Sequence, residues 1–221
     1  LLSVPNSLSL EDKSKYGNNG AWHGSPTWET GKLGYGLHFN GTDAYLDAGN
    51  AASLDVDTFT ASSWIKTTGT EYKMWMGRGG GQYWLEHHTS RLGFVITTTE
   101  GITELFATVN YYDGNWHHVV NTYDGANMRM YMDGKEINSV AKTGTISGLG
   151  SLLIGRYSAD YQFTGSIDEV RLYNRALSAD EVRELYERGL GTQAPYVDIT
   201  SGKVGIGTTG PGSALDIRAS L

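Results

Sequence analysis

The chain has 221 residues, of which 19% are charged, and its formal net charge is −7. This acidity disfavours nucleic acid as a partner, because nucleic acid is itself a polyanion. The sequence has no cysteine and no apolar run long enough to span a bilayer, so we expect neither a disulfide framework nor insertion into a membrane.

Short strand-like segments separated by turns fill region 33–175, which shows no sustained helical periodicity. Asn40-Gly41 and Asp133-Gly134 are typical two-residue hairpin turns. Many short antiparallel strands at this spacing predict a sandwich or a jelly roll. The predicted strands are 36–40, 44–48, 59–66, 74–77, 83–87, 92–97, 104–109, 116–123, 127–132, 152–155 and 166–173.

The last predicted strand contains a carboxylate in a costly position and leads through a turn into a short helix. Alternation places Asp168 on the same face as Val170 and Leu172. A carboxylate on an apolar face is costly unless it is paired, hydrogen-bonded or bound to a metal, so Asp168 is the best single candidate for a ligand. Ser178 and Glu181 form a predicted capping box where the helix begins.

Six segments are informative as an ordered set: GLHFNGTDAYLDAG, FTASSWIKT, GNWHHVVNTYDG, MRMYMDGKEI, LLIGR and FTGSIDEVRLYNRALSADEVREL. Their order resembles that of laminin-G-like, concanavalin-A-like jelly-roll domains, and the resemblance covers roughly residues 8–189. It implies an all-β, two-sheet antiparallel jelly-roll sandwich at residues 1–190, with one short C-terminal helix and a strand-like tail. Domains of this kind usually bind glycans or proteins and often stand beside enzymes.

The resemblance also implies a calcium ion where the N-terminal loop meets the last strand. The loop from Asp12 to Gly20 resembles the family pattern D-x-S-G-x-G-N-x-G, with Lys15 in place of a usual glycine. Calcium prefers carboxylate, amide and carbonyl oxygens, and the implied ligands are Asp12, Asn18, Gly20 and Asp168. The alternative is that Asp12 and Asn18 only form turns, and the charge of Lys15 counts mildly against a cation.

Aromatic residues gather in or beside predicted loops and strand ends. Sugar C–H faces stack on exposed rings, so an aromatic groove with polar neighbours would suit a carbohydrate. Core packing is the alternative, and we assign Phe39, Trp64 and Trp116 to the core because they lie in family motifs that usually fill it. The candidate ligand-binding residues are Tyr72, Trp75, Arg78, Tyr83, Trp84, Tyr157 and Tyr161, with Glu86, His87 and His88 as candidate hydrogen-bonding companions.

We expect no enzymatic activity. A retaining glycosidase needs two carboxyl groups close together across the scissile bond, and glucanases of related jelly rolls place them on one strand as E-x-D-x-E or E-x-D-x-x-E. No such run occurs here. His117 and His118 are adjacent strand residues that point to opposite faces. A nucleophile elbow, a zinc-protease motif and a phosphate loop are also absent from the sequence.

A different kind of segment follows a short linker near the C-terminal end. The run SGKVGIGTTGPGSALDI resembles the VGIGTT segment of phage tail fibres, head fibres and large bacterial surface proteins, which are commonly trimeric. Its apolar residues cannot form a core alone, so pairing with other copies would bury them. We predict that residues 191–221 are a linker and a stalk or oligomerisation segment of a homotrimer, with a flexible extension as the alternative. We also expect further protein beyond Leu1 and Leu221.

Two functional classes remain open from the sequence. The first is a non-catalytic module that binds a glycan or a host receptor and is carried on a viral (phage) fibre or a similar appendage. It would lie on the virion surface or be extracellular. The second is a structural or decoration protein of a viral or bacterial surface assembly with no glycan ligand.

Overall fold

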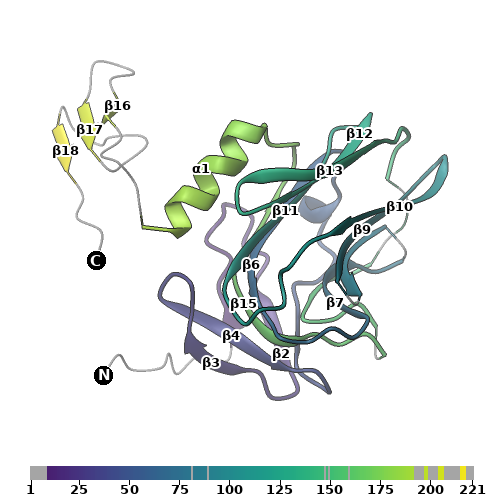
Figure 1. The fold of residues 1–221 in the computed structure, drawn as a ribbon, viewed down its shortest axis with the longest axis horizontal. Coiled ribbons are helices and arrows are strands. Elements are labelled where there is room, and N and C mark those ends of the chain that lie inside the picture. Colours follow the sequence, from purple (N-terminus) through teal and green to yellow (C-terminus); the bar gives the residue numbers. More distant parts are fainter. Residues whose placement is uncertain are drawn as a thin grey trace.

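The protein is described by a computed structural model that covers residues 9–191, except 81, 89, 147, 149 and 159, and the tail segments 197–198, 204–206 and 215–217. Two antiparallel sheets stack over one hydrophobic core, and a single short helix follows the last strand of the sandwich (Figure 1). This architecture confirms the expected all-β jelly-roll sandwich with one C-terminal helix.

Sheet A contains eight strands within the described residues, and its ladders are antiparallel. The strands from β7 to β10 follow one another as hairpins, whereas β5 and β14 come together from distant parts of the sequence. In spatial order the strands are β1 (Ser9–Leu10), β2 (Gly20–His23), β5 (Tyr45–Asp47), β14 (Leu152–Ile154), β7 (Lys73–Arg78), β8 (Tyr83–His88), β9 (Arg91–Thr98) and β10 (Gly101–Thr108).

Sheet B contains seven antiparallel strands in the same described part of the chain. Asp133 and Gly134 join two of them and have φ angles of 50° and 77°, as a two-residue hairpin turn requires. A 3-10 helix, η1 (Ala52–Leu54), precedes β6. In spatial order the strands are β13 (Lys135–Ala141), β12 (Asn127–Met132), β11 (His117–Tyr123), β6 (Phe59–Lys66), β15 (Thr164–Tyr173), β4 (Tyr35–Asn40) and β3 (Thr27–Thr30).

The core lies between the inner faces of the two sheets. Phe59, Ala61 and Ile65 alternate along β6 and are all buried in it, together with Phe39 as expected. Phe59 stacks on Tyr83 of sheet A with ring centroids 4.4 Å apart, so the sheets are in direct contact. Burial of each large apolar side chain contributes about 1.5–3 kcal/mol, which makes this interior the main source of stability.

Helix α1 (Ala179–Gly189) packs on the outer face of sheet B (Figure 1). The predicted capping box is present, because the Glu181 N–H donates to Ser178 Oγ at 3.3 Å and the Ser178 N–H donates to Glu181 Oε2 at 2.9 Å. Val182 and Leu185 form a second small core with residues of β11 and β12. The helix therefore covers a strip of sheet B that would otherwise be exposed.

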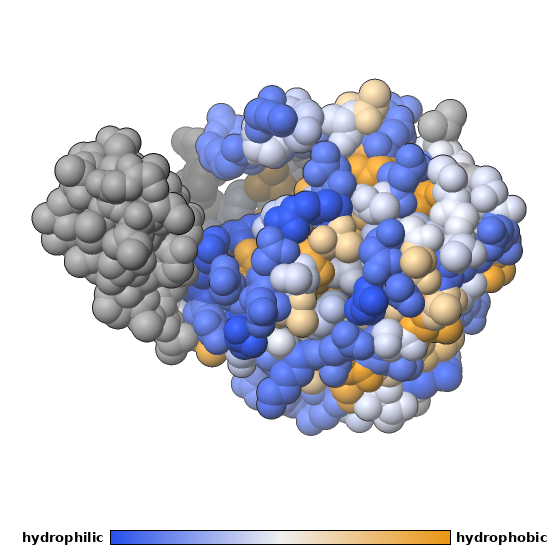
Figure 2. All heavy atoms as spheres, turned by 90° about the horizontal axis from the view of Figure 1, so that it is seen from above, coloured by the Kyte–Doolittle hydropathy of each residue, from blue (hydrophilic) through white to orange (hydrophobic). Residues whose placement is uncertain are grey.

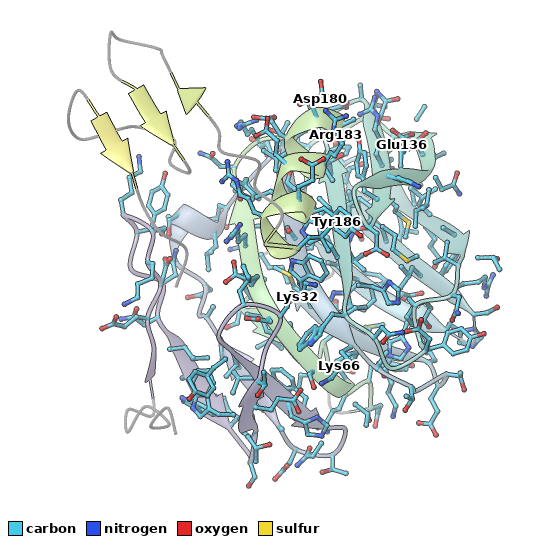
Figure 3. The ribbon with its side chains drawn as sticks, turned by 60° about the vertical axis from the view of Figure 1, so that its left-hand side comes forward. Lys32, Lys66, Glu136, Asp180, Arg183 and Tyr186 are labelled. Carbon is cyan, nitrogen blue, oxygen red and sulfur yellow. The ribbon has the colours of Figure 1, made fainter. Side chains whose placement is uncertain are left out.

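Trp64 belongs to this covered strip, which corrects its assignment to the core between the sheets. Its ring stacks on that of Tyr186 in α1, with centroids 5.6 Å apart, and the Lys32 Nζ lies 4.5 Å from its ring. Figure 3 labels these two partners, Tyr186 on the helix and Lys32 in the β3–β4 turn. Trp116 is also not a core residue, because it is only half-buried and the Lys66 Nζ lies 5.1 Å from its ring. Alternation along β6 sends the Trp64 ring outward, where α1 covers it, whereas Trp116 immediately precedes β11.

Three short tail strands form a separate sheet: β16 (Val197–Asp198) pairs antiparallel with β17 (Val204–Ile206), which pairs parallel with β18 (Leu215–Ile217). Much of the predicted stalk segment lies outside the described residues, and the domain boundary near residue 190 stays a prediction. In the part of the chain that the structure describes, no helix combines the length and apolar composition needed to cross a bilayer. Seen from above, apolar side chains form small scattered patches on a mainly hydrophilic surface (Figure 2).

Candidate functional site

The outer face of sheet A holds a group of aromatic and polar side chains near the middle of the sheet. Strand β8 positions part of it by alternation. Tyr83, Leu85 and His87 point into the core and are buried, whereas Trp84 and Glu86 lie on the outer face. The remaining members come from the segment before β7 and from the loop between β14 and β15.

Glu86 is the centre of the group. Its Oε2 accepts hydrogen bonds from the Tyr72 hydroxyl at 2.8 Å and from the Trp84 Nε1–H at 2.6 Å. The residue is only 3% exposed, and burial raises the pKa of Glu86 although these two bonds act to lower it. Burial and the bond to Glu86 likewise raise the pKa of Tyr72. One carboxylate therefore fixes two rings in position.

The β14–β15 loop adds two more rings. Tyr157 lies beside Trp84 with ring centroids 5.3 Å apart, and Tyr161 lies edge-on to Tyr72 with centroids 4.9 Å apart. The loop is tied to β7 through its backbone, since the Gly155 N–H donates to the Trp75 carbonyl at 2.8 Å. The rings therefore rest on a hydrogen-bonded support.

Two glycines leave room for this arrangement. A Cβ on Gly77 would lie 2.8 Å from Cδ2 of Tyr157, so the ring rests where a side chain would otherwise stand. A Cβ on Gly93 would lie 2.6 Å from Cγ of Glu86 and 2.7 Å from Cε1 of Phe106. Glycine inside a strand commonly marks such a close approach.

We call Tyr72, Trp84, Glu86, Tyr157 and Tyr161 the aromatic platform. Its four rings are half-buried, so each presents part of its surface to solvent. A rigid aromatic surface with a fixed acceptor can stack the C–H face of a sugar ring and orient it. A separate shallow hollow, beside the Arg78–Asp55 ion pair, has no aromatic wall among its described lining residues and offers less for such a ligand.

Three of the predicted ligand-binding residues are interior, and their assignment to exposed loops was wrong. A bulge between Met74 and Met76 places Trp75 in the core, where it is 0% exposed. Arg78 is 1% exposed and forms an ion pair with Asp55 at 2.5 Å. Tyr83 is 0% exposed. Trp75 and Tyr83 lie in β7 and β8, close to the predicted strands 74–77 and 83–87, but their side chains point into the core.

Two of the predicted calcium ligands lie together in the β1–β2 loop. The Asp12 carboxylate accepts hydrogen bonds from the Ser14 N–H, the Ser14 hydroxyl and the Asn18 N–H, each at 2.8 Å. Burial acts to raise the pKa of Asp12, but these bonds lower it below its ordinary value. Asn18 Oδ1 accepts from the Ser53 hydroxyl at 2.9 Å. Gly20 is the first residue of β2.

Asp168 is engaged with a different loop. Its Oδ2 accepts from the Leu33 N–H at 2.9 Å, in the β3–β4 turn, and its Oδ1 accepts from the Glu169 N–H at 2.7 Å. A bulge at Glu169, whose φ is 51°, breaks the alternation. Asp168 therefore shares the outer face of sheet B with Trp64, which corrects its placement beside Leu172. Burial raises the pKa of Asp168.

The described hydrogen bonds do not bring the four expected calcium ligands to one point. Asp12 and Asn18 bond within the β1–β2 loop, whereas Asp168 caps the β3–β4 turn. Among the described residues, no group of three or more His, Asp or Glu side chains is arranged to hold a metal. The calcium site stays a prediction.

The sequence predicts Glu86 only as a hydrogen-bonding companion, whereas the structure places it at the centre of the platform. The available signal was the spacing of Trp84 and Glu86, two residues apart on one strand and hence on one face. The contribution of Tyr157 and Tyr161 beside that strand had no local signal. Only the folded topology brings their loop next to β7.

The family of the protein follows from its sequence together with this fold. The chain belongs to the concanavalin A-like lectin/glucanases superfamily (Laminin_G_3), whose pattern matches residues 40–183. Among curated proteins, it is similar to Pappalysin-1 of Mus musculus, with 27% identity over 188 residues. That match covers 73% of this chain and only 12% of Pappalysin-1.

Several solved structures have the same fold at low identity. The binding domain of Paraclostridial Mosquitocidal Protein 1 aligns with a TM-score of 0.71 and 16% identity, covering 82% of this chain and 51% of that one. The botulinum neurotoxin serotype G binding domain aligns with a TM-score of 0.70 and 15% identity, covering 86% of this chain and 52% of that one. A third structure is Domain 4 of AbnA, an extracellular arabinanase from Geobacillus stearothermophilus, in complex with arabinotriose. It aligns with a TM-score of 0.62 and 20% identity, covering 74% of this chain and 82% of that one. The chain thus spans about half of each toxin domain.

Proposed function

We propose that the protein is a non-catalytic recognition module that binds a glycan, or a receptor bearing one, at the aromatic platform. The observation that carries this proposal is the pair of hydrogen bonds by which Tyr72 and Trp84 converge on Glu86. They fix two partly exposed rings beside a buried acceptor. Such preorganisation lowers the entropic cost of binding, because the side chains that contact the ligand are already ordered.

The structural relatives support a binding role. They include the receptor binding domain of a botulinum neurotoxin C/D mosaic serotype, a type C neurotoxin whose cell entry depends on two ganglioside molecules, and an arabinanase domain in complex with arabinotriose. The arabinanase is extracellular, and an extracellular location is the one we propose for this protein.

We further propose that the module is carried on a viral (phage) fibre or a similar surface appendage, as a homotrimer on the virion surface. The resemblance of the tail to fibre segments supports this proposal. Sedimentation of the full chain and of a version that ends at Gly189 tests it. A trimer that becomes a monomer on truncation is expected. If both proteins sediment as monomers, the proposal is contradicted. A trimer that survives truncation would place the interface on the jelly roll.

The alternative is a structural or decoration protein whose jelly roll contacts only other subunits of an assembly. A glycan array probed with the full chain separates the two functions. Discrete binding to a set of saccharides is the result that our proposal expects. An array on which nothing binds, combined with binding to neighbouring particle subunits, would favour the decoration role.

A further inference from the structure

An unusual stack of side chains lies on the same outer face as the aromatic platform. The Arg156 guanidinium lies 3.5 Å from the ring centroid of Tyr45, and the Tyr45 ring stacks on His23 with centroids 4.3 Å apart. Arg156 is half-buried, and its Nε is covered without a hydrogen-bond partner among the described residues. A planar guanidinium fixed on an aromatic ring is prepared to bind a carboxylate or a similar anion.

Arg156 differs from most other arginines of the chain because no described carboxylate pairs with it. Arg91 shares this property, and it also lies on the outer face of sheet A, with its guanidinium 4.7 Å from the ring centroid of Phe106. Both arginines therefore rest on rings on one face of the protein. The described arginines that form ion pairs instead are Arg78, Arg129, Arg171, Arg175, Arg183 and Arg188.

Arg156 is close to the platform in the fold as well as in the sequence. It immediately precedes Tyr157, whose ring lies over Gly77. Tyr45, which supports Arg156, is on β5, and Gly77 is on β7; both strands pair with β14. Adjacent strands are about 4.8 Å apart, so the two supports are separated by about 10 Å across the sheet, within reach of a short oligosaccharide.

We infer that the ligand is an acidic saccharide, whose carboxylate pairs with Arg156 while its uncharged ring surface stacks on Tyr157 and Trp84. This inference rests on the proposed function and deepens it. The guanidinium would bind the carboxylate through two parallel N–H···O hydrogen bonds, which would fix the orientation of the sugar on the rings.

The carboxylates on this face are compatible with such a ligand. Asp47, two residues from Tyr45 on β5, accepts a hydrogen bond from the Gly49 N–H at 2.7 Å instead of pairing with Arg156. Glu86 is covered and bonded to two rings. Glu104 is exposed on β10, at the edge of sheet A and several strands away from β5. No described carboxylate forms an ion pair with Arg156, so its guanidinium stays available for the carboxylate of a ligand.

The test compares free acids with their methyl esters, which keep the sugar and remove its charge. The full chain is titrated with trigalacturonate, with 3′-sialyllactose and with the methyl ester of each. At least one free acid should bind about tenfold more tightly than its ester, and added salt should weaken that binding. Arg156→Gln should abolish the difference, whereas Arg129→Gln, which removes an arginine paired with Asp124 on sheet B, should retain it.

The outcomes distinguish this inference from the function on which it rests. Equal binding of acids and esters, or an unchanged preference in Arg156→Gln, would overturn the acidic ligand and leave saccharide binding intact. Absence of binding to these probes and to every saccharide on the array would overturn both. Thermal melting of Arg156→Gln and Arg156→Lys shows whether each variant is folded, and the lysine variant should retain part of the preference because it keeps the charge.

Discussion

The rings of Trp84 and Tyr157 lie with their centroids 5.3 Å apart on the outer face of sheet A, although they come from a strand and from a distant loop. Gly77 makes this contact possible, because its missing side chain gives Tyr157 a place on the sheet. The platform therefore depends on the glycine at position 77 as well as on its own rings.

Replacing Gly77 with alanine should displace Tyr157 and weaken saccharide binding. The added Cβ would lie 2.8 Å from the Tyr157 ring and 3.0 Å from Cβ of Trp84, which is closer than normal contact. Near-ultraviolet circular dichroism should change for Gly77→Ala. Gly79→Ala is the matched control, because its Cβ would have no neighbour nearer than 3.5 Å. Identical spectra and affinities for both variants would show that Tyr157 does not depend on Gly77.

Two tryptophans near each other in the sequence should lose different amounts of stability on truncation. Trp75 is fully buried in the core, so Trp75→Ala should reduce the free energy of unfolding by about 3–5 kcal/mol. Trp84 lies on the outer face and is half-exposed, so Trp84→Ala should cost about 1 kcal/mol. Urea denaturation of both variants measures this difference. Equal losses would mean that Trp84 is a core residue and would remove the platform's main ring.

His117 should stabilise the fold mainly at acidic pH. Its ring bonds to Asp133 at 2.8 Å and Asp113 at 3.1 Å, and the bond to Asp133 raises its pKa above the ordinary 6.5. This stabilisation is complete below about pH 6.5 and is lost as the pH rises through the folded-state pKa. The melting-temperature deficit of His117→Gln should therefore be larger at pH 5.5 than at pH 9. A deficit independent of pH would contradict the charged pair.

His118 should act in the opposite direction. Burial lowers its pKa to about 4, so the unfolded chain binds the extra proton first as the pH falls from 6.5. The neutral ring bonds to Ser62 at 2.9 Å and stacks on Trp64. The folded protein therefore loses stability as the pH falls from 6.5 to about 4. His118→Gln should show a shallower decline in melting temperature across that range than the unaltered protein. Parallel declines would show that His118 is not the group responsible.

The calcium site implied by family resemblance predicts a specific response to a chelator. An ion that binds only to the native state stabilises that state, so EDTA should lower the melting temperature of the unaltered protein. Asp168→Ala should not respond, because a ligand has been removed. Equal responses in both proteins, or none in either, would leave Asp168 with the role its bond to Leu33 already gives it, as the cap of the β3–β4 turn.

The fold was largely predictable because hydrophobic alternation, hairpin turns and the capping box are local signals. The strands that were missed are β1, β2, β3 and β13, which lie at or near sheet edges. No residue of β2, β3 or β13 is fully buried, so these strands lack a clear apolar pattern. The bulge at Glu169 was also unpredictable, since nothing local marks a positive φ at a glutamate. One shifted residue was enough to reverse the expected face of Asp168.

The candidate site could be predicted only in part. Tyr72, Trp84, Tyr157 and Tyr161 were named as loop aromatics, but the sequence could not show that one carboxylate and one loop bring them together. Trp75, Arg78 and Tyr83 were indistinguishable from them by composition. Their burial depends on which residues of β7 and β8 point into the core. The bulge between Met74 and Met76 shifts the alternation within β7, so this cannot be read from the sequence.

The most direct test of the account is a glycan array probed in parallel with the full chain, Trp84→Ala and Tyr16→Ala. Tyr16 is 50% exposed and lies outside the platform, so its variant is a matched aromatic control. We predict that Tyr16→Ala retains the binding pattern of the full chain, whereas Trp84→Ala loses about tenfold or more in affinity while its melting temperature changes little. Full binding by a folded Trp84→Ala protein would contradict the claim that the aromatic platform is the binding site.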